Sequence, residues 1–458
     1  MKGIIGLSVL LAFCAHASAL ENERVLALKN VTLIDGTGAP PQPQMTVLVT
    51  NNRIAAIRQS AKAQLPGNVQ EMDLSGKFLI PGLWDVHVHL CTAGENALPL
   101  FIANGITSVR DMGGDFELLM QWKREIEQGK RIGPRIKTPG PILESSANVE
   151  RLKRESTFEP VDRFRLGLAD PASAEGVVAR LAGLGVDFIK IRTVASMETY
   201  QAITAAAHKY HLSVAGHQVA SPEAMLQAGQ QSIEHGFFPP LIERTAEQRR
   251  ALFRKLVTNG TAIVPTLVLT GDAFQLPPER IKAIVQDAKG TLDFRRQYVS
   301  GYLITVWMAQ VAKQKTYPPE LQALLRESSR DLREMHQSGV RIMPGTDVAG
   351  LLIWPGFSLH EELRLLVEQV GMTRMEALLS ATRAPAEFLG LAQDWGTIQE
   401  GKIADLVLLD RDPLENIQNT RSIAAVLFGG RLFSKSDIQK MLAECAARAQ
   451  QEAGQVPR

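Results

Sequence analysis

The chain has 458 residues, of which 45% are hydrophobic and 21% charged, and it contains 36 glycines and 24 prolines. This composition excludes disordered, collagenous and coiled-coil proteins, and the length allows either two to four domains or one large barrel with an additional domain. Its 50 basic and 48 acidic residues give a net charge of +2, which disfavours nucleic acid and anionic membranes as partners.

The first residues have the pattern of an export signal. Lys2 precedes the apolar run Ile4–Phe13, and residues 17–19 match an A-x-A cleavage site. We therefore expect a signal peptide at residues 1–19 and a protein that is exported to the periplasm or secreted. No later segment has the roughly 18 consecutive apolar residues of a membrane span, so no membrane contact is expected after the signal is removed. Cys91 and Cys445 remain after cleavage, and we expect no disulfide between them.

Two segments after the signal predict β-strands. Val25–Asp35 and Met45–Ile57 are rich in Val, Thr and Ile, and the turn-forming residues 36–41 separate them, which predicts antiparallel strands. From Lys77 onward, short apolar segments alternate with helical segments, which is the pattern of a parallel sheet with βα connections.

This alternation predicts eight strands and the helices between them. The expected strands are Phe78–His89, Ile106–Met112, Arg135–Thr138, Val186–Ile191, Leu212–His217, Gln231–His235, Ala262–Leu267 and Val340–Asp347. The expected helices include Phe116–Gln128, Ser173–Leu184, Ser196–Tyr210, Ser221–Ala228 and Ala246–Asn259. Eight strand–helix units over about 310 residues fit an α/β fold of the (β/α)₈, TIM-like barrel type.

The remaining segments complete the expected domain organisation. Leu276–Glu327 is an insertion that we expect to form long helices, and β-type sequence returns at Gly396–Ile398, Ala404–Leu409 and Ile423–Leu432. Both chain ends should therefore build one small β-sandwich, followed by an exposed C-terminal helix and a tail. The predicted boundaries are 20–80 for the first sandwich part, 81–390 for the barrel, 391–435 for the second sandwich part and 436–458 for the helix and tail.

Residue types that can bind metals collect at the predicted strand ends. Strand alternation places His87 and His89 on one face, and His217, His235 and Asp347 each end a further strand. The carboxyl ends of barrel strands are where such enzymes carry their chemistry. Chance is a poor explanation for four of the nine histidines at these positions.

Lys190 is the least obvious candidate. Alternation along Val186–Ile191 points its side chain into the barrel, where a free ammonium beside a cation site would be repelled and desolvated. An amine that captures CO₂ would instead become an anionic carbamate able to bridge two cations. From spacing alone, a salt-bridged lysine whose ammonium reaches solvent remains the plainer interpretation.

Five segments together resemble the metal-dependent amidohydrolase superfamily, and the resemblance extends from about Val25 to Phe433. They are Leu79–His89, Gly105–Asp111, Ile233–Gly236, Pro344–Asp347 and Gly396–Val407. Within that superfamily, Phe188-Ile189-Lys190 is similar to the branch with a carboxylated lysine, which contains prolidase-like dipeptidases and their relatives.

The resemblance implies two divalent ions, most often zinc. It implies that His87, His89 and Asp347 hold the first ion, that His217 and His235 hold the second, and that Lys190 bridges both as its CO₂-derived carbamate. A metal-bridging hydroxide would then attack an amide carbon, and Asp347 would pass the proton to the leaving nitrogen.

The substrate is the least determined part of this hypothesis. Prolidase-like relatives often carry a tyrosine three residues after the histidine that ends strand six, but this chain has Phe238, which cannot donate a hydrogen bond. We favour a dipeptide of the Xaa-Pro type or an N-acyl amino acid as the small-molecule substrate. A cyclic-amide hydrolase of the imidazolonepropionase type is the alternative, and a non-catalytic periplasmic binding protein is the alternative of another class. The sequence leaves open whether the protein forms a homo-oligomer.

Three other residues have weaker interpretations. Arg110, at the end of strand two, suits a structural ion pair and a substrate contact equally well. His360 belongs either near the ligands or to a helix N-terminus. We expect Cys91 not to bind metal, because the site already has its ligands.

Overall fold

The computed structural model describes residues 25–67, 69–156, 159–236, 241–270, 276–299, 301–313 and 319–453. The predicted signal peptide and Phe238 lie outside these residues.

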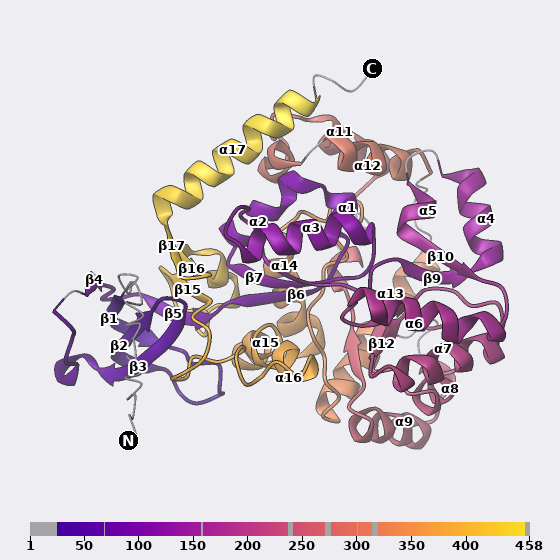
Figure 1. Cartoon of the computed structure of the whole chain (residues 1–458), viewed down its shortest axis with the longest axis horizontal. Coiled ribbons are helices and arrows are strands. Elements are labelled where there is room, and N and C mark those ends of the chain that lie inside the picture. Colours follow the sequence, from indigo (N-terminus) through magenta and orange to yellow (C-terminus); the bar gives the residue numbers. More distant parts are fainter. Residues whose placement is uncertain are drawn as a thin grey trace, which may run out of the picture.

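Strands from both chain ends form one eight-stranded sheet, at the lower left of Figure 1. Its strand order is β17-β16-β15-β5-β1-β2-β3, with β4 paired to β1. The strands are β1 (Val25–Leu33), β2 (Gln42–Thr50), β3 (Arg53–Gln59), β4 (Gln70–Asp73), β5 (Phe78–Pro81), β15 (Leu406–Leu409), β16 (Ile423–Phe428) and β17 (Arg431–Ser434). The predicted antiparallel pairing of the first two strands is confirmed. Val31 and Val47 pack in one core with Leu406 and Leu427, so both chain ends enclose a common interior.

The predicted strand Phe78–His89 is two strands, which corrects the sequence interpretation. β5 pairs with β1 and β15, whereas β6 (Leu83–Val88) pairs with β7 (Ile106–Asp111) in a different sheet. Gly82 separates them, and a Cβ atom at this position would lie 2.1 Å from Thr107 Oγ1. The chain can therefore pass from one sheet to the next here only with a glycine.

The parallel strands lie in two groups. β6, β7 and β8 (Arg135–Lys137) form one sheet, and a six-stranded sheet has the order β10-β9-β11-β12-β13-β14. The strands of the second sheet are β9 (Ile142–Ser145), β10 (Arg165–Leu168), β11 (Ile189–Ile191), β12 (Val214–Gly216), β13 (Ser232–Glu234) and β14 (Ala262–Val264).

Single backbone contacts connect the two groups in a circular order. The Asp187 amide donates to Thr138 O at 2.8 Å, which joins β8 to the entry of β11. Parallel bridges join Ile263 to Ile342 and Val348 to Val88. The predicted strand Val340–Asp347 is thus an extended segment held by isolated bridges and not a regular strand. β9 and β10 are not among the predicted strands.

Helices cover the outside of the parallel strands (Figure 1). The five named in the prediction are found within one or two residues at α3 (Phe116–Glu127), α6 (Ala174–Leu184), α7 (Met197–Lys209), α8 (Pro222–Gln227) and α9 (Ala246–Thr258). The predicted insertion contains α11 (Pro278–Gln286), α12 (Gly301–Lys313) and the start of α13 (Pro319–Gln337). The further α-helices are α1 (Leu90–Ala93), α2 (Leu98–Ala103), α4 (Ser146–Glu155), α5 (Val161–Phe164), α14 (Ser358–Leu365), α15 (Arg374–Ser380), α16 (Arg383–Phe388) and α17 (Lys435–Ala453).

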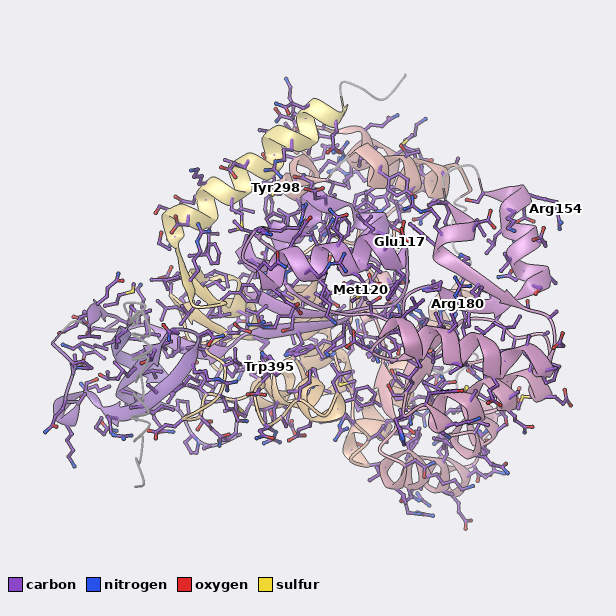
Figure 2. All side chains as sticks on the ribbon, viewed as in Figure 1. Glu117, Met120, Arg154, Arg180, Tyr298 and Trp395 are labelled. Atoms are coloured by element: carbon purple, nitrogen blue, oxygen red, sulfur yellow. The ribbon has the colours of Figure 1, made fainter. Side chains whose placement is uncertain are left out.

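The C-terminal helix α17 is not simply exposed, which corrects a second expectation. Its residues Met441 and Cys445 are buried, and the Asn96 side chain donates to Cys445 O at 3.0 Å and to Tyr298 O at 3.1 Å. Figure 2 labels Tyr298 beside this helix. Cys91 and Cys445 are both buried free thiols. None of the helices in the described ranges is long and apolar enough to cross a membrane.

Candidate metal centre

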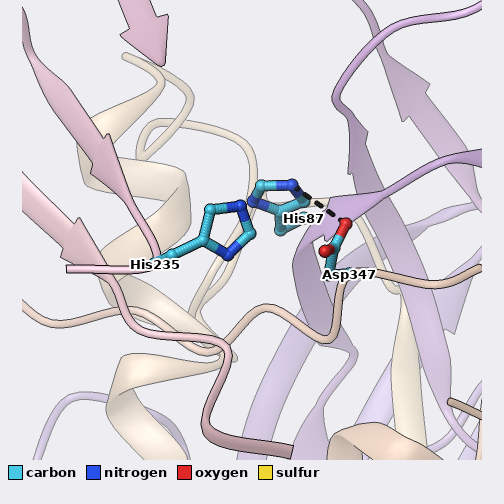
Figure 3. Close-up of side chains that lie close together, drawn as sticks. All are labelled: His87, His235 and Asp347. Atoms are coloured by element: carbon cyan, nitrogen blue, oxygen red, sulfur yellow. Dashed lines mark ion pairs between the residues drawn. The ribbon is translucent and has the colours of Figure 1, made fainter. Parts of the chain in front are cut away.

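The predicted metal ligands at the end of β6 and in the segment after Ile342 lie close together. Nε2 of His87 lies 3.3 Å from Asp347 Oδ1, and Nε2 of His89 lies 3.4 Å from the same oxygen. His235 joins them, because ligand atoms of His87, His235 and Asp347 all lie within 4.8 Å of one another. Figure 3 shows these three side chains pointing toward a common centre, with the contact between His87 and Asp347 dashed.

A carboxylate determines the proton position on His87. Its Nδ1 lies 2.7 Å from Glu234 Oε2, and both side chains are buried. An ionised carboxylate only accepts hydrogen bonds, so Nδ1 carries the proton and donates it. Nε2 then presents a lone pair, and this buried atom has no hydrogen-bond partner among the described residues.

The same tautomer follows for two further histidines. Nδ1 of His89 lies 3.2 Å from Gly113 O, which can only accept. Nδ1 of His235 lies 2.8 Å from Thr266 Oγ1, and that hydroxyl donates its own proton to Pro265 O at 2.8 Å. His89 and His235 therefore donate through Nδ1 and keep Nε2 as a lone pair. Ligand histidines in metal sites are oriented by this kind of outer contact.

Two of the ligand positions have left-handed backbone conformations. The φ angle is 68° at His235 and 57° at Asp347, values that non-glycine residues adopt only where packing enforces them. Gly345 permits the close approach, since a Cβ atom there would lie 2.6 Å from His87 Cβ. Thr346 anchors the turn by donating through its amide and its hydroxyl to Asp85, at 3.0 and 2.6 Å.

The electrostatics suit ligands at neutral pH. Burial raises the pKa of Asp347, but a positive charge on His87 and hydrogen bonds from His87 and His89 outweigh it and hold the pKa well below its usual range; when Nε2 of both rings is a lone pair, a bound cation would take over this effect. Burial lowers the pKa of His235 to about 3 and that of His217 further. Asp347 is thus an anion, and His217 and His235 are neutral imidazoles, which are the protonation states that metal ligation requires.

Lys190 and His217 lie beside the three-residue cluster. The ring centroids of His217 and His235 are 4.9 Å apart. Lys190 is only 1% exposed, and its Nζ has no hydrogen-bond partner within the described ranges. Burial lowers the pKa of Lys190 to about 8, with Glu234 and Asp347 opposing the shift.

Glu234 is a functional residue that sequence reasoning missed. Besides His87, it binds Arg110, whose Nη2 donates to Oε1 at 2.8 Å. Burial raises the pKa of Glu234, but Arg110 and His87 outweigh it, so the group stays ionised. The alternation of side chains along the strand could have revealed it, because Ser232 and Glu234 are two residues apart and therefore face the same side. A carboxylate that faces the barrel interior needs a charged or hydrogen-bonding partner. Thr266 was missed because its role depends on a turn after β14.

The structure assigns the weaker candidates to packing. Arg110 makes the structural ion pair with Glu234 and lies over the Phe188 ring at 5.5 Å. His360 is buried between Thr420 Oγ1 at 2.9 Å and Asn104 O at 3.1 Å. The Cys91 thiol contacts Asp115 O at 3.8 Å and is not in the three-residue cluster.

These residues fit a divalent metal centre. The donor set combines histidine nitrogens, each oriented by a separate acceptor, with a carboxylate, and such a set suits zinc. The buried, unpartnered Nε2 of His87 gains a partner when a cation binds.

Comparisons with known proteins agree with this geometry. The chain is 25% identical over 451 residues to ochratoxinase from Aspergillus niger, with 91% of this chain and 88% of the relative covered. It is 23% identical over 398 residues to imidazolonepropionase from Bdellovibrio bacteriovorus, with 81% of this chain and 83% of the relative covered.

Among solved structures, a Xaa-Pro dipeptidase with methionine bound in its active site superimposes with a TM-score of 0.67 at 22% identity. The match covers 90% of this chain and 100% of that one, and it shows a shared fold, which implies a TIM-like barrel with a β-sandwich domain. The Amidohydrolase family matches residues 78–433. The chain therefore belongs to the amidohydrolase family and is a metal-dependent hydrolase of carbon–nitrogen bonds.

Proposed function

We propose that this protein hydrolyses the amide bond of a small open-chain substrate, either a dipeptide of the Xaa-Pro type or an N-acyl amino acid, at a centre of two zinc ions. The observation that carries the proposal is the shared tautomer of His87, His89 and His235, whose Nδ1 atoms all donate to separate acceptors. Three lone pairs are thus available beside the Asp347 carboxylate.

The proposed ligands divide into two groups, one for each metal ion. His87, His89 and Asp347 hold the first ion, since both Nε2 atoms lie within 3.4 Å of Asp347 Oδ1. His217 and His235, whose rings are 4.9 Å apart, hold the second. When bound, such ions polarise a carbonyl and lower the pKa of water from about 15.7 to about 7.

Asp347 is the acid–base residue of the proposed reaction. Its carboxylate accepts the proton of the attacking water as the new C–O bond forms, and it delivers that proton to the nitrogen as the C–N bond breaks. The products are a carboxylic acid and an amine, so the reaction consumes one water.

Lys190 serves as the bridging ligand in its carbamate form. Its buried, unpartnered Nζ and a pKa of about 8, lowered by burial, favour the neutral amine that reacts with CO₂. Apo-protein reloaded with zinc should recover two ions per chain in bicarbonate buffer and fewer in CO₂-depleted buffer, whereas equal recovery contradicts the carbamate.

A substrate panel tests the function. Zinc-loaded protein is assayed against Xaa-Pro dipeptides, N-acyl amino acids and cyclic amides, with Asp347→Asn as the inactive control. Hydrolysis of an open-chain amide is expected. Hydrolysis of cyclic amides only would favour the second candidate, an imidazolonepropionase-like activity, which the Bdellovibrio relative supports. Two bound ions without turnover of any substrate would overturn both.

A further inference from the structure

Arg192 stands beside the centre without being one of its ligands. In the parallel register of β11 and β12, Lys190 pairs with Ala215 and Ile191 pairs with Gly216. The next pair is Arg192 and His217, and the His217 amide donates to Ile191 O at 3.1 Å. Alternation places Arg192 on the same face as Lys190, one layer nearer the carboxyl ends of the strands.

The Arg192 guanidinium is held from one side only. Its Nη1 donates to Glu144 Oε1 at 3.1 Å, and its side chain is 36% exposed. Its backbone amide donates to Leu143 O at 3.0 Å, which fixes the start of the side chain. The other guanidinium donors of Arg192 have no partner among the residues that the structure describes.

Glu144 does not need Arg192 to be satisfied. This buried carboxylate also accepts from Arg165, from Thr193 Oγ1 at 2.6 Å and from Asn148 Nδ2 at 2.5 Å. Arg165 is only 11% exposed and also binds Glu159, so its guanidinium is already paired with two carboxylates. Of the two arginines on Glu144, Arg192 is the one that keeps guanidinium donors without a partner among the described residues.

Glu144 does not fully balance the Arg192 charge, because this one carboxylate pairs with both Arg165 and Arg192. Arg192 directly follows Ile191, whose carbonyl oxygen accepts from the His217 amide at 3.1 Å, so Arg192 lies next to the proposed cation site. A fixed cation repels the metal ions that His217 would bind. An anion between them relieves this repulsion, and a guanidinium fork matches a carboxylate in two parallel hydrogen bonds.

We propose that Arg192 binds the carboxylate of the substrate and so restricts the enzyme to amides of free amino acids. The inference rests on the proposed function, in which dipeptides and N-acyl amino acids both end in a carboxylate. Arg192 is a specificity-determining residue here, and Glu144 positions it.

The test compares two ligands that differ only in charge. Calorimetry measures the binding of N-acetyl-L-proline and of N-acetyl-L-prolinamide to zinc-loaded protein that is wild type or Arg192→Met at position 192, both in the Asp347→Asn background, which suppresses turnover of either ligand. The wild type should prefer the acid, and Arg192→Met should lose roughly 10- to 100-fold affinity for the acid, the effect of one charge-assisted contact, with the amide unchanged. Arg192→Lys should restore part of the preference, since it keeps the charge without the fork.

Arg165→Met is the matched control, because it removes the other arginine from Glu144 and should keep the preference for the acid. Zinc content is measured for each variant, so that a preference lost together with zinc is distinguished from one lost with Arg192. The proposal is overturned if the wild type binds both ligands equally, or if Arg192→Met keeps the wild-type ratio. Binding is measured without turnover, so this test and the substrate panel can fail independently. Failure of the panel would overturn the proposed function, whereas equal binding of the two ligands would overturn only the role of Arg192.

Discussion

Replacing Glu234 with glutamine exchanges one carboxylate oxygen for an amide nitrogen, so the two contacts of the Glu234 carboxylate are affected differently. Glu234 Oε1 accepts from Arg110 Nη2 at 2.8 Å, and Oε2 accepts from His87 Nδ1 at 2.7 Å. Glutamine has one oxygen for both donors, and the charged Arg110 takes it in preference. The amide NH₂ group then faces His87 Nδ1, so the ring proton moves to Nε2, the atom that should bind metal.

Two magnitudes follow from this arrangement. An uncompensated partner of a buried ion pair costs about 3–5 kcal/mol, and Arg110 is only 1% exposed. Loss of the outer acceptor of a ligand histidine lowers metal affinity by about 10- to 100-fold. Urea unfolding of the apo-protein measures the first quantity, and zinc competition against a chelator of known affinity measures the second.

Ser232→Ala is the matched control for this prediction. Ser232 Oγ donates to the same oxygen of Glu234 that Arg110 contacts, and it does not touch His87. We expect it to lower the unfolding free energy by about 1–2 kcal/mol and to leave zinc affinity unchanged. Wild-type zinc affinity in Glu234→Gln would refute the reasoning, since the proton on His87 would then not depend on Glu234.

Three further substitutions test other parts of the structure. Asp347→Asn keeps a ligand oxygen but cannot accept a proton, so turnover of the best panel substrate should fall by about 10²–10⁴-fold with zinc retained, and unchanged turnover excludes the acid–base role. Thr266→Val removes the acceptor of His235 Nδ1, and zinc competition should show at least about tenfold weaker binding; equal binding would count against the inferred tautomer. Burial, with a smaller contribution from Arg421, lowers the pKa of His360 to about 3, so the folded state binds fewer protons than the unfolded state below about pH 6.5. The unfolding free energy of the apo-protein should therefore fall, by about 5 kcal/mol at most, between pH 6.5 and 3, and His360→Asn should show a shallower fall; an identical slope would contradict this assignment.

Regular alternation made part of the site predictable. His87 lies on β6 and His89 directly follows its end, two residues later, and both Nε2 atoms lie near Asp347 Oδ1. His235 could be assigned only as the residue that ends a strand, because its positive φ breaks the alternation. This break lets Glu234 and His235, adjacent in sequence, both reach the centre, and long-range packing maintains it.

The sequence was less informative about which strands pair and which side chains are in contact. Nothing local in Phe78–His89 indicates that its two halves belong to different sheets, since the reason is the contact between Gly82 and Thr107. Arg192 resembles any surface arginine until the register with β12 places it next to His217. Both features depend on residues distant in the chain, which periodicity does not report.

The sheet that joins the two chain ends has a consequence for the order of folding. β5 pairs with β15, and Pro81 and Leu406 are opposite each other although more than 300 residues separate them. During synthesis, the apolar residues Leu79 and Ile80 stay unpaired on that side until nearly the whole chain has emerged, although β1 can pair with the other side of β5 early. Only Gly82 lies between β5 and the strand that carries His87, so the first proposed metal ligands adjoin a strand whose second partner is among the last to be made.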